Sequence, residues 1–165
     1  MVAESAGLSA SDLVVEFGAG YGRLTEQLAL RASQVVAVEI DAALARRLAG
    51  RYRERSNVTV VQGDALAVPL PRRPFKVVSN PPFHITPALL HRLLDDPAVP
   101  VVRADLVVGW GAALALTGVF GPAHKARPWL ARFEFLLLSR LPAGLFDPTP
   151  AQAAALVSIR RRGLS

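Results

Sequence analysis

The chain has 165 residues, 52% apolar and 19% charged, a composition that fits one globular domain with a single core. Cysteine is absent, which excludes disulfides, thiolate zinc sites, thiol nucleophiles and iron–sulfur clusters. Basic residues outnumber acidic ones by 19 to 13, for a formal net charge of +6. This surplus indicates a polyanionic partner such as nucleic acid, unless it only reflects the arginine usage of a GC-rich genome. No basic segment precedes an apolar stretch at the start, so no secretory signal is visible and we expect a cytoplasmic location.

Apolar, β-branched runs alternate with segments of helical periodicity along most of the chain. Five runs are predicted to be strands, at residues 13–17, 34–40, 57–61, 75–79 and 103–108, and the first has the apolar pattern of a buried parallel strand. Three segments are predicted to be helices, at residues 22–31, from the N-cap Asp41 to about residue 52, and at 86–94. Two last runs, 129–141 and 154–161, leave little room for a helix between them. The order predicts an α/β fold with a doubly wound, Rossmann-like sheet, mostly parallel and with an antiparallel strand at the edge.

Residues 106–123 carry no formal charge, and this length is enough to suggest a membrane span. Glycines and Thr117 interrupt the stretch, so we predict a buried strand followed by a buried helix and expect no membrane association.

A glycine-rich turn, Glu16-Phe-Gly-Ala-Gly-Tyr-Gly22, joins the first predicted strand to the first predicted helix. Glycines let a backbone approach a ligand closely and turn sharply. The spacing differs from the G-x-G-x-x-G of dinucleotide binders, so a pyrophosphate is not indicated. A tight turn with a purely structural role stays an alternative.

Acidic residues follow the second and third predicted strands. Glu39 can accept hydrogen bonds from both ribose hydroxyls of an adenosine ligand that lies across the strand ends. Asp64 can accept a hydrogen bond from an adenine amino group. The alternatives are a strand-end acid beside the Asp41 cap and a simple Gly-Asp turn.

The tetrapeptide Asn80-Pro-Pro-Phe83 follows the fourth predicted strand. Its prolines fix φ and leave their carbonyls without local donors, so the Asn80 side-chain oxygen and the Pro81 carbonyl can both face one exocyclic amino group. Phe83 offers a flat face for a flipped base, although a plain Pro-Pro turn is the alternative. These features, at successive strand ends, predict an S-adenosylmethionine-dependent methyltransferase that acts on an amino group, above all N6 of adenine.

The sequence resembles the ribosomal RNA adenine N6-methyltransferase superfamily, and within it the erythromycin-resistance (Erm) methyltransferases of 23S rRNA. The matching stretches are VVEFGAGYGRLTEQLA, VVAVEIDAALARRL, NVTVVQGDAL, PFKVVSNPPFHITPALLHRLL, FEFLLLSRLPAGLFDPTPAQAAAL and SIRRR. The resemblance implies a methyltransferase sheet, S-adenosylmethionine as cofactor, and ribosomal RNA, with 23S favoured, as partner. It further implies N6-methylation of a specific adenine, macrolide-type resistance, no metal and a monomer.

The resemblance also implies roles for matching positions. The implied cofactor-binding residues are Glu16, Gly18, Gly20, Glu39, Ile40, Asp64, Ala65 and Asn80. The implied catalytic residues are Asn80, Pro81, Phe83 and Phe146, of which the two phenylalanines would hold the flipped target base.

Three features depart from the family pattern. The usual Gln-Asn/His-Phe-Leu segment over the methionine end of the cofactor is not found, and apolar Gly109-Trp-Gly111 replaces a polar stretch. The family's C-terminal helical domain is missing after Arg162, so we expect residues 1–165 to form a single catalytic domain.

Other functions stay open: a small-subunit (16S) rRNA adenine dimethyltransferase, whose box usually reads Asn-Leu-Pro-Tyr, a DNA adenine methyltransferase, or a non-catalytic RNA-binding protein with a vestigial cofactor pocket. Two basic runs are either solvated surface or phosphate contacts: Arg46, Arg47, Arg51, Arg53 and Arg55, partly offset by Glu54, and 160–162. His84, His91 and His124 are expected to be ordinary surface or helix residues.

Overall fold

The computed structural model describes residues 2–119, 126, 128–142 and 153–163. Its strands are β1 (Leu13–Phe17), β2 (Gln34–Glu39), β3 (Val58–Gln62), β4 (Phe75–Ser79), β5 (Val101–Gly109), β6 (Phe133–Leu141) and β7 (Ala154–Arg161). Its helices are α1 (Val2–Ser5), α2 (Arg23–Ala29), α3 (Ala42–Arg51), α4 (Thr86–Leu94), α5 (Trp110–Thr117) and the 3-10 turn η1 (Phe83–Ile85).

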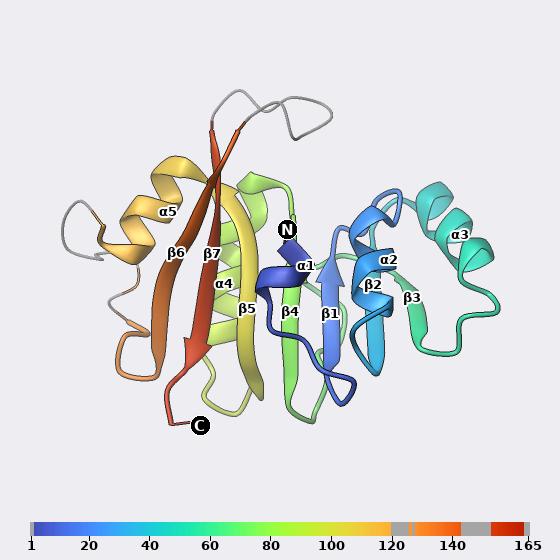
Figure 1. Cartoon of the computed structure of the whole chain (residues 1–165), viewed down its shortest axis with the longest axis horizontal. Coiled ribbons are helices and arrows are strands. Elements are labelled where there is room, and N and C mark those ends of the chain that lie inside the picture. Colours follow the sequence, from blue (N-terminus) through green and yellow to red (C-terminus); the bar gives the residue numbers. More distant parts are fainter. Residues whose placement is uncertain (1, 120–125, 127, 143–152, 164–165) are drawn as a thin grey trace.

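Seven strands form one sheet in the order β3-β2-β1-β4-β5-β7-β6. Strands β1 to β5 are parallel, whereas β7 runs antiparallel to both β5 and β6. Helices α1 to α3 pack on one face of the sheet, and α4 and α5 pack on the other (Figure 1). The predicted doubly wound, mostly parallel sheet with an antiparallel hairpin at one edge is therefore confirmed.

All seven predicted strands are found, including the partly exposed edge strand β3. All five residues of β1 are buried, and such strands give uninterrupted apolar runs. The uncharged stretch also divides as expected, because β5 ends at Gly109 and α5 follows at once. No helix in the described ranges is long and apolar enough to cross a membrane.

Three elements differ most from the sequence prediction, whereas β2, β3 and β5 depart from their predicted bounds by one or two residues. The strand expected from residue 129 begins at Phe133, because Trp129 is buried in a turn and its Nε1–H donates to Asp95 Oδ1 at 2.8 Å. Helix α2 is shorter than predicted at both ends. Helix α1 was not predicted, since its four residues are too few to show helical periodicity.

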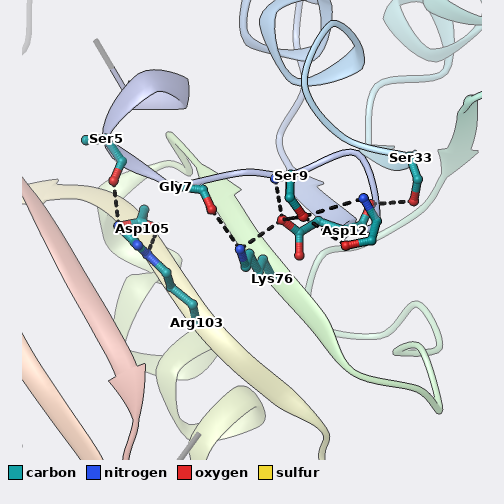
Figure 2. Close-up of polar contacts among 9 residues, drawn as sticks. Ser5, Gly7, Ser9, Asp12, Ser33, Lys76, Arg103 and Asp105 are labelled. Carbon is teal, nitrogen blue, oxygen red and sulfur yellow. Dashed lines mark hydrogen bonds and ion pairs between the residues drawn. The ribbon is translucent and has the colours of Figure 1, made fainter. Parts of the chain in front are cut away.

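Two cationic side chains on β4 and β5 hold the segment that leads into β1 (Figure 2). Lys76 Nζ donates to the Gly7 carbonyl and to Asp12 Oδ2, both at 2.9 Å. Arg103 Nη2 donates to the Ser5 carbonyl at 2.6 Å, and its Nε donates to Asp105 Oδ2 at 2.7 Å. Because Asp12 directly precedes β1, these contacts fix where the first strand starts relative to the sheet.

We expect Asp105→Ala to destabilise the fold. Asp105 is fully buried, so its removal leaves the Arg103 guanidinium, whose side chain is 15% exposed, without its carboxylate. Breaking such a buried pair costs about 3 kcal/mol of unfolding free energy. Urea denaturation measures the loss, with Glu26→Ala, which removes the exposed Arg51–Glu26 pair, as the control. A loss for Asp105→Ala no larger than that of the control would contradict this role.

Candidate functional site

The loops after β1, β2, β3 and β4 line one cleft of about 1070 Å³ at the carboxyl edge of the sheet. This edge is the usual ligand crevice of doubly wound sheets, at the point where the strand order reverses. Among the cleft-lining residues are the predicted site residues Glu16, Gly18, Gly20, Glu39, Ile40, Asp64, Ala65, Asn80, Pro81 and Phe83. The structure therefore brings these ten residues together. Phe146 lies outside the described residues.

The glycine turn after β1 needs left-handed backbone at three positions. The φ angles are +74° at Gly18, +55° at Gly20 and +78° at Gly22, a region that side chains disfavour. At Gly22 a Cβ atom would also lie 2.6 Å from Leu48 Cδ2, so only glycine fits against α3. At Gly18 the turn approaches the Asn80 loop, because a Cβ there would lie 3.6 Å from Pro82 Cδ.

Glu39 joins the glycine turn to the start of α3. It is buried, and its Oε2 accepts a hydrogen bond from Gly20 N at 2.7 Å while its Oε1 accepts one from Asp41 N at 2.9 Å. Asp41 caps α3 as predicted, with Oδ1 accepting from two backbone N–H groups. Each carboxylate oxygen of Glu39 has a second acceptor position, so the fixed carboxylate can still receive ribose hydroxyls.

Glu16 is a buried carboxyl, 2% exposed, at the end of β1. Its pKa is raised from 4.5 to about 8, mainly by burial and to a smaller extent by the negative charge of Glu39, while hydrogen bonds from Thr25 lower it. Thr25 Oγ1 donates to Glu16 Oε2 at 2.6 Å. Glu16 is therefore largely protonated at neutral pH unless a cation enters the cleft.

Asp64 lies on a turn that α4 holds in place. Its Oδ1 accepts from Leu66 N at 2.8 Å. The guanidinium of Arg92, on α4, donates to the backbone carbonyls of Ala65 and Val68. Sequence reasoning missed Arg92, because nothing local connects it to a turn more than twenty residues earlier.

The Asn80 loop is tied to β1 by a side chain that the sequence did not single out. Ser79 is fully buried, and its hydroxyl accepts a hydrogen bond from Phe17 N at 2.8 Å. Asn80 is exposed to the cleft, whereas Pro81 behind it is buried. The cleft is also lined by Tyr21 and by His84, which was expected to be an ordinary surface residue.

A doubly wound sheet with a glycine turn and acidic side chains at neighbouring strand ends is the arrangement of S-adenosylmethionine-dependent methyltransferases. Residues 1–164 match the family described as ribosomal RNA adenine dimethylase, and the chain belongs to this family. The resemblance inferred from the sequence is thus confirmed. S-adenosylmethionine is the cofactor of the family, and the acidic groups and close-approach glycines of this cleft fit a cationic adenosine ligand.

Named relatives include methyltransferases of both ribosomal subunits. The chain is 32% identical over 161 residues to the rRNA adenine N-6-methyltransferase of Bacillus licheniformis, covering 98% of this chain and 56% of that protein. It is 36% identical over 155 residues to ribosomal RNA small subunit methyltransferase A of Synechococcus sp. (strain JA-2-3B'a(2-13)), covering 90% and 55%. Among solved structures, 23S rRNA methyltransferase ErmE has a TM-score of 0.89 at 33% identity, covering 98% of this chain and 66% of that one. The chain thus spans little more than half the length of these two named proteins.

We expect cofactor binding to release a proton through Glu16. The sulfonium and ammonium charges of S-adenosylmethionine favour the ionised carboxylate, so binding lowers a pKa that is about 8 without them. Affinity should rise with pH up to about 8, and calorimetry in buffers of different ionisation enthalpy should show proton release near neutral pH.

The Glu16→Gln variant should lose this release, whereas Glu26→Gln, which changes an exposed acid on α2, should keep it. Equal proton release by wild type and Glu16→Gln would assign the linkage to another group.

We also expect Arg92→Met to weaken cofactor binding by loosening the Asp64 turn. Hydrogen bonds from a charged donor are worth about 1.5–3 kcal/mol each, so the KM for S-adenosylmethionine should rise about tenfold with a smaller change in kcat. Arg92→Lys should restore part of the affinity, because one ammonium can still reach one carbonyl. A loss confined to kcat, or no loss, would show that Arg92 does not position the turn.

Proposed function

We propose that the chain catalyses N6-methylation of an adenine in ribosomal RNA, with S-adenosylmethionine as the methyl donor and 23S rRNA as the favoured substrate. The observation that carries the proposal is the position of Asn80-Pro-Pro-Phe83 in the same cleft as Gly18, Glu39 and Asp64. An amide oxygen and an adjacent carbonyl can therefore lie beside a bound adenosine cofactor.

The chemistry mainly requires alignment. Adenine N6 is a poor nucleophile, because its lone pair is delocalised into the ring, and the cofactor supplies an electrophilic methyl group on a sulfonium. Hydrogen bonds from N6–H to the Asn80 side-chain oxygen and the Pro81 carbonyl favour a pyramidal nitrogen with its lone pair free. The nitrogen–carbon bond would form as the carbon–sulfur bond breaks, the electron pair would stay on the sulfur of the departing neutral thioether, and the cationic product amine would pass a proton to solvent. No histidine or cysteine is needed as a general base.

Base holding is the proposed role of Phe83 and Phe146. Phe83 is half-buried at the cleft, where a flipped adenine can stack on its ring. Stacking lets the enzyme bind any unpaired adenine, so the choice of nucleotide falls to contacts with the surrounding RNA.

The 23S assignment is supported by the 33% identity and TM-score of 0.89 with ErmE. Methylation of 23S rRNA would then confer macrolide-type resistance, and we propose a cytoplasmic monomer. The second candidate is 16S rRNA, which the 36% identity with ribosomal RNA small subunit methyltransferase A favours. Incubation of protein-free 23S and 16S rRNA with labelled cofactor, followed by mapping of reverse-transcription stops, separates the two.

A non-catalytic RNA-binding protein is the remaining rival. Calorimetry with S-adenosylmethionine separates it from an enzyme, because a vestigial pocket gives no saturable heat. Saturable binding without methyl transfer to either rRNA would also contradict the proposed activity.

We expect Asn80→Ala to lower kcat for rRNA methylation by on the order of 10² or more while the fold stays intact, because the variant loses a hydrogen bond to the reacting amine. Single-turnover kinetics with labelled cofactor measure the change. Gln27→Ala, which removes an exposed amide on α2, is the matched control and should leave turnover unchanged. Near wild-type turnover in Asn80→Ala would remove this side chain from the mechanism.

A further inference from the structure

Tyr21 is an exposed aromatic residue at the rim of the cleft. Its exposed fraction is 65%, although it lies between Gly20 and Gly22 in the turn that shapes the cleft. Large aromatic side chains usually bury most of their surface or cover a partner. The fold therefore presents this ring to solvent on a turn held by hydrogen bonds from Gly22 N to the Ala19 carbonyl and from Gly20 N to Glu39.

Arginines of α3 hold Tyr21 in place. The guanidinium carbon of Arg47 lies 5.6 Å from the centre of the Tyr21 ring, and Arg51 Nη1 donates to the Tyr21 carbonyl at 3.3 Å. Arg47 and Arg51 are one turn apart on the helix, so both face the glycine turn. The cation occupies part of the ring and leaves the rest accessible.

The positive charge beside Tyr21 is only partly neutralised. Arg51 pairs with Glu26 at 2.6 Å. Arg46, Arg47, Arg53 and Arg55 are exposed, and within the described ranges none of them forms an ion pair. These four side chains are therefore available for phosphate groups.

The second basic run of the sequence has different contacts. Arg161 donates to the carbonyls of Val101 and Val99, at 2.9 and 2.7 Å. Arg162 donates to the carbonyls of Leu130 and Phe133, at 3.1 and 3.3 Å. Because these guanidinium groups bind the protein's own backbone, the first basic run, which begins at Arg46 on α3, is the better candidate for an RNA contact.

We propose that Tyr21 and Arg47 form a nucleotide platform, on which a base of the RNA substrate outside the target adenine stacks against Tyr21 while Arg47 and Arg46 contact its phosphates. An exposed aromatic ring flanked by arginines is the usual way to bind single-stranded RNA. The inference rests on the proposed function and adds to it the path of the RNA, which crosses from the Asn80 loop over the glycine turn to α3.

Binding of protein-free 23S rRNA, measured by filter binding across a salt series, tests the platform. Tyr21→Ala should weaken binding about tenfold, in line with the loss of one stacked base, and Tyr21→Phe should restore it. Arg47→Gln should reduce the slope of log K against log salt by about 1. Arg72→Gln, which changes an exposed arginine just before β4, at the opposite edge of the sheet, should leave the slope unchanged.

Two results would overturn the platform: RNA affinity of Tyr21→Ala within twofold of wild type, or an equal loss of S-adenosylmethionine affinity, which would make Tyr21 a cofactor contact. Binding needs no methyl transfer, so it separates this inference from the proposed function. If the wild type binds and methylates rRNA, and the Tyr21 and Arg47 variants bind RNA as well as the wild type does, the platform alone is refuted. If the wild type binds rRNA without methylating it, and the variants bind RNA more weakly, the proposed activity alone is refuted. If the wild type binds neither rRNA, both proposals are refuted.

Discussion

The separation of β1 and β4 at their carboxyl ends is the constraint on which the cleft depends. The register of this strand pair ends at Val15 and Val77, although both strands continue. Beyond that point the Phe17 N–H binds the hydroxyl of Ser79 instead of a backbone carbonyl. The ladder therefore gives way to a side-chain bridge, which lets the two strand ends part without leaving a buried N–H unpaired.

The cleft has two halves, the glycine turn after β1 and the Asn80 loop after β4, and they lie on either side of this opening. The glycine turn after β1 bends toward β2, where Gly18 N and Ala19 N both bind the Val38 carbonyl. The Asn80 loop follows β4 and leads through η1 into α4, which packs on the opposite face of the sheet from α2. Gly18 still lies close to Pro82, so the groups proposed to bind the cofactor and the substrate remain neighbours although they belong to different halves of the sheet. Alignment of a methyl donor with an amine needs this proximity.

Most of the sheet and the cleft could be predicted from the sequence, because both depend on local patterns. Buried parallel strands give continuous apolar runs, and loops at their carboxyl ends meet at one edge, so Glu39 and Asn80 could be placed together without coordinates. The bonds that hold the loops could not be predicted. Ser79 binds Phe17, and Arg92 binds the turn after Asp64, across separations that no local periodicity encodes.

Charge is divided between the floor of the cleft and its rim. Glu16 and Glu39 are buried at the floor, where Glu39 attracts a cationic ligand and Glu16 adds to the attraction once it ionises, while the negative charge of Glu39 repels a polyanion. The unpaired Arg46 and Arg47 lie on α3, with Arg47 beside Tyr21 at the rim, and Arg53 and Arg55 follow the helix; all four are exposed, so solvent screens them and phosphates can reach them. The proposed function would thus let a protein with a net charge of +6 bind a sulfonium inside an acidic cleft and RNA outside it. In the proposed function, only an extruded, uncharged base would have to cross from the basic rim to the acidic floor, so recognition of the RNA and methylation of the base would use separate surfaces.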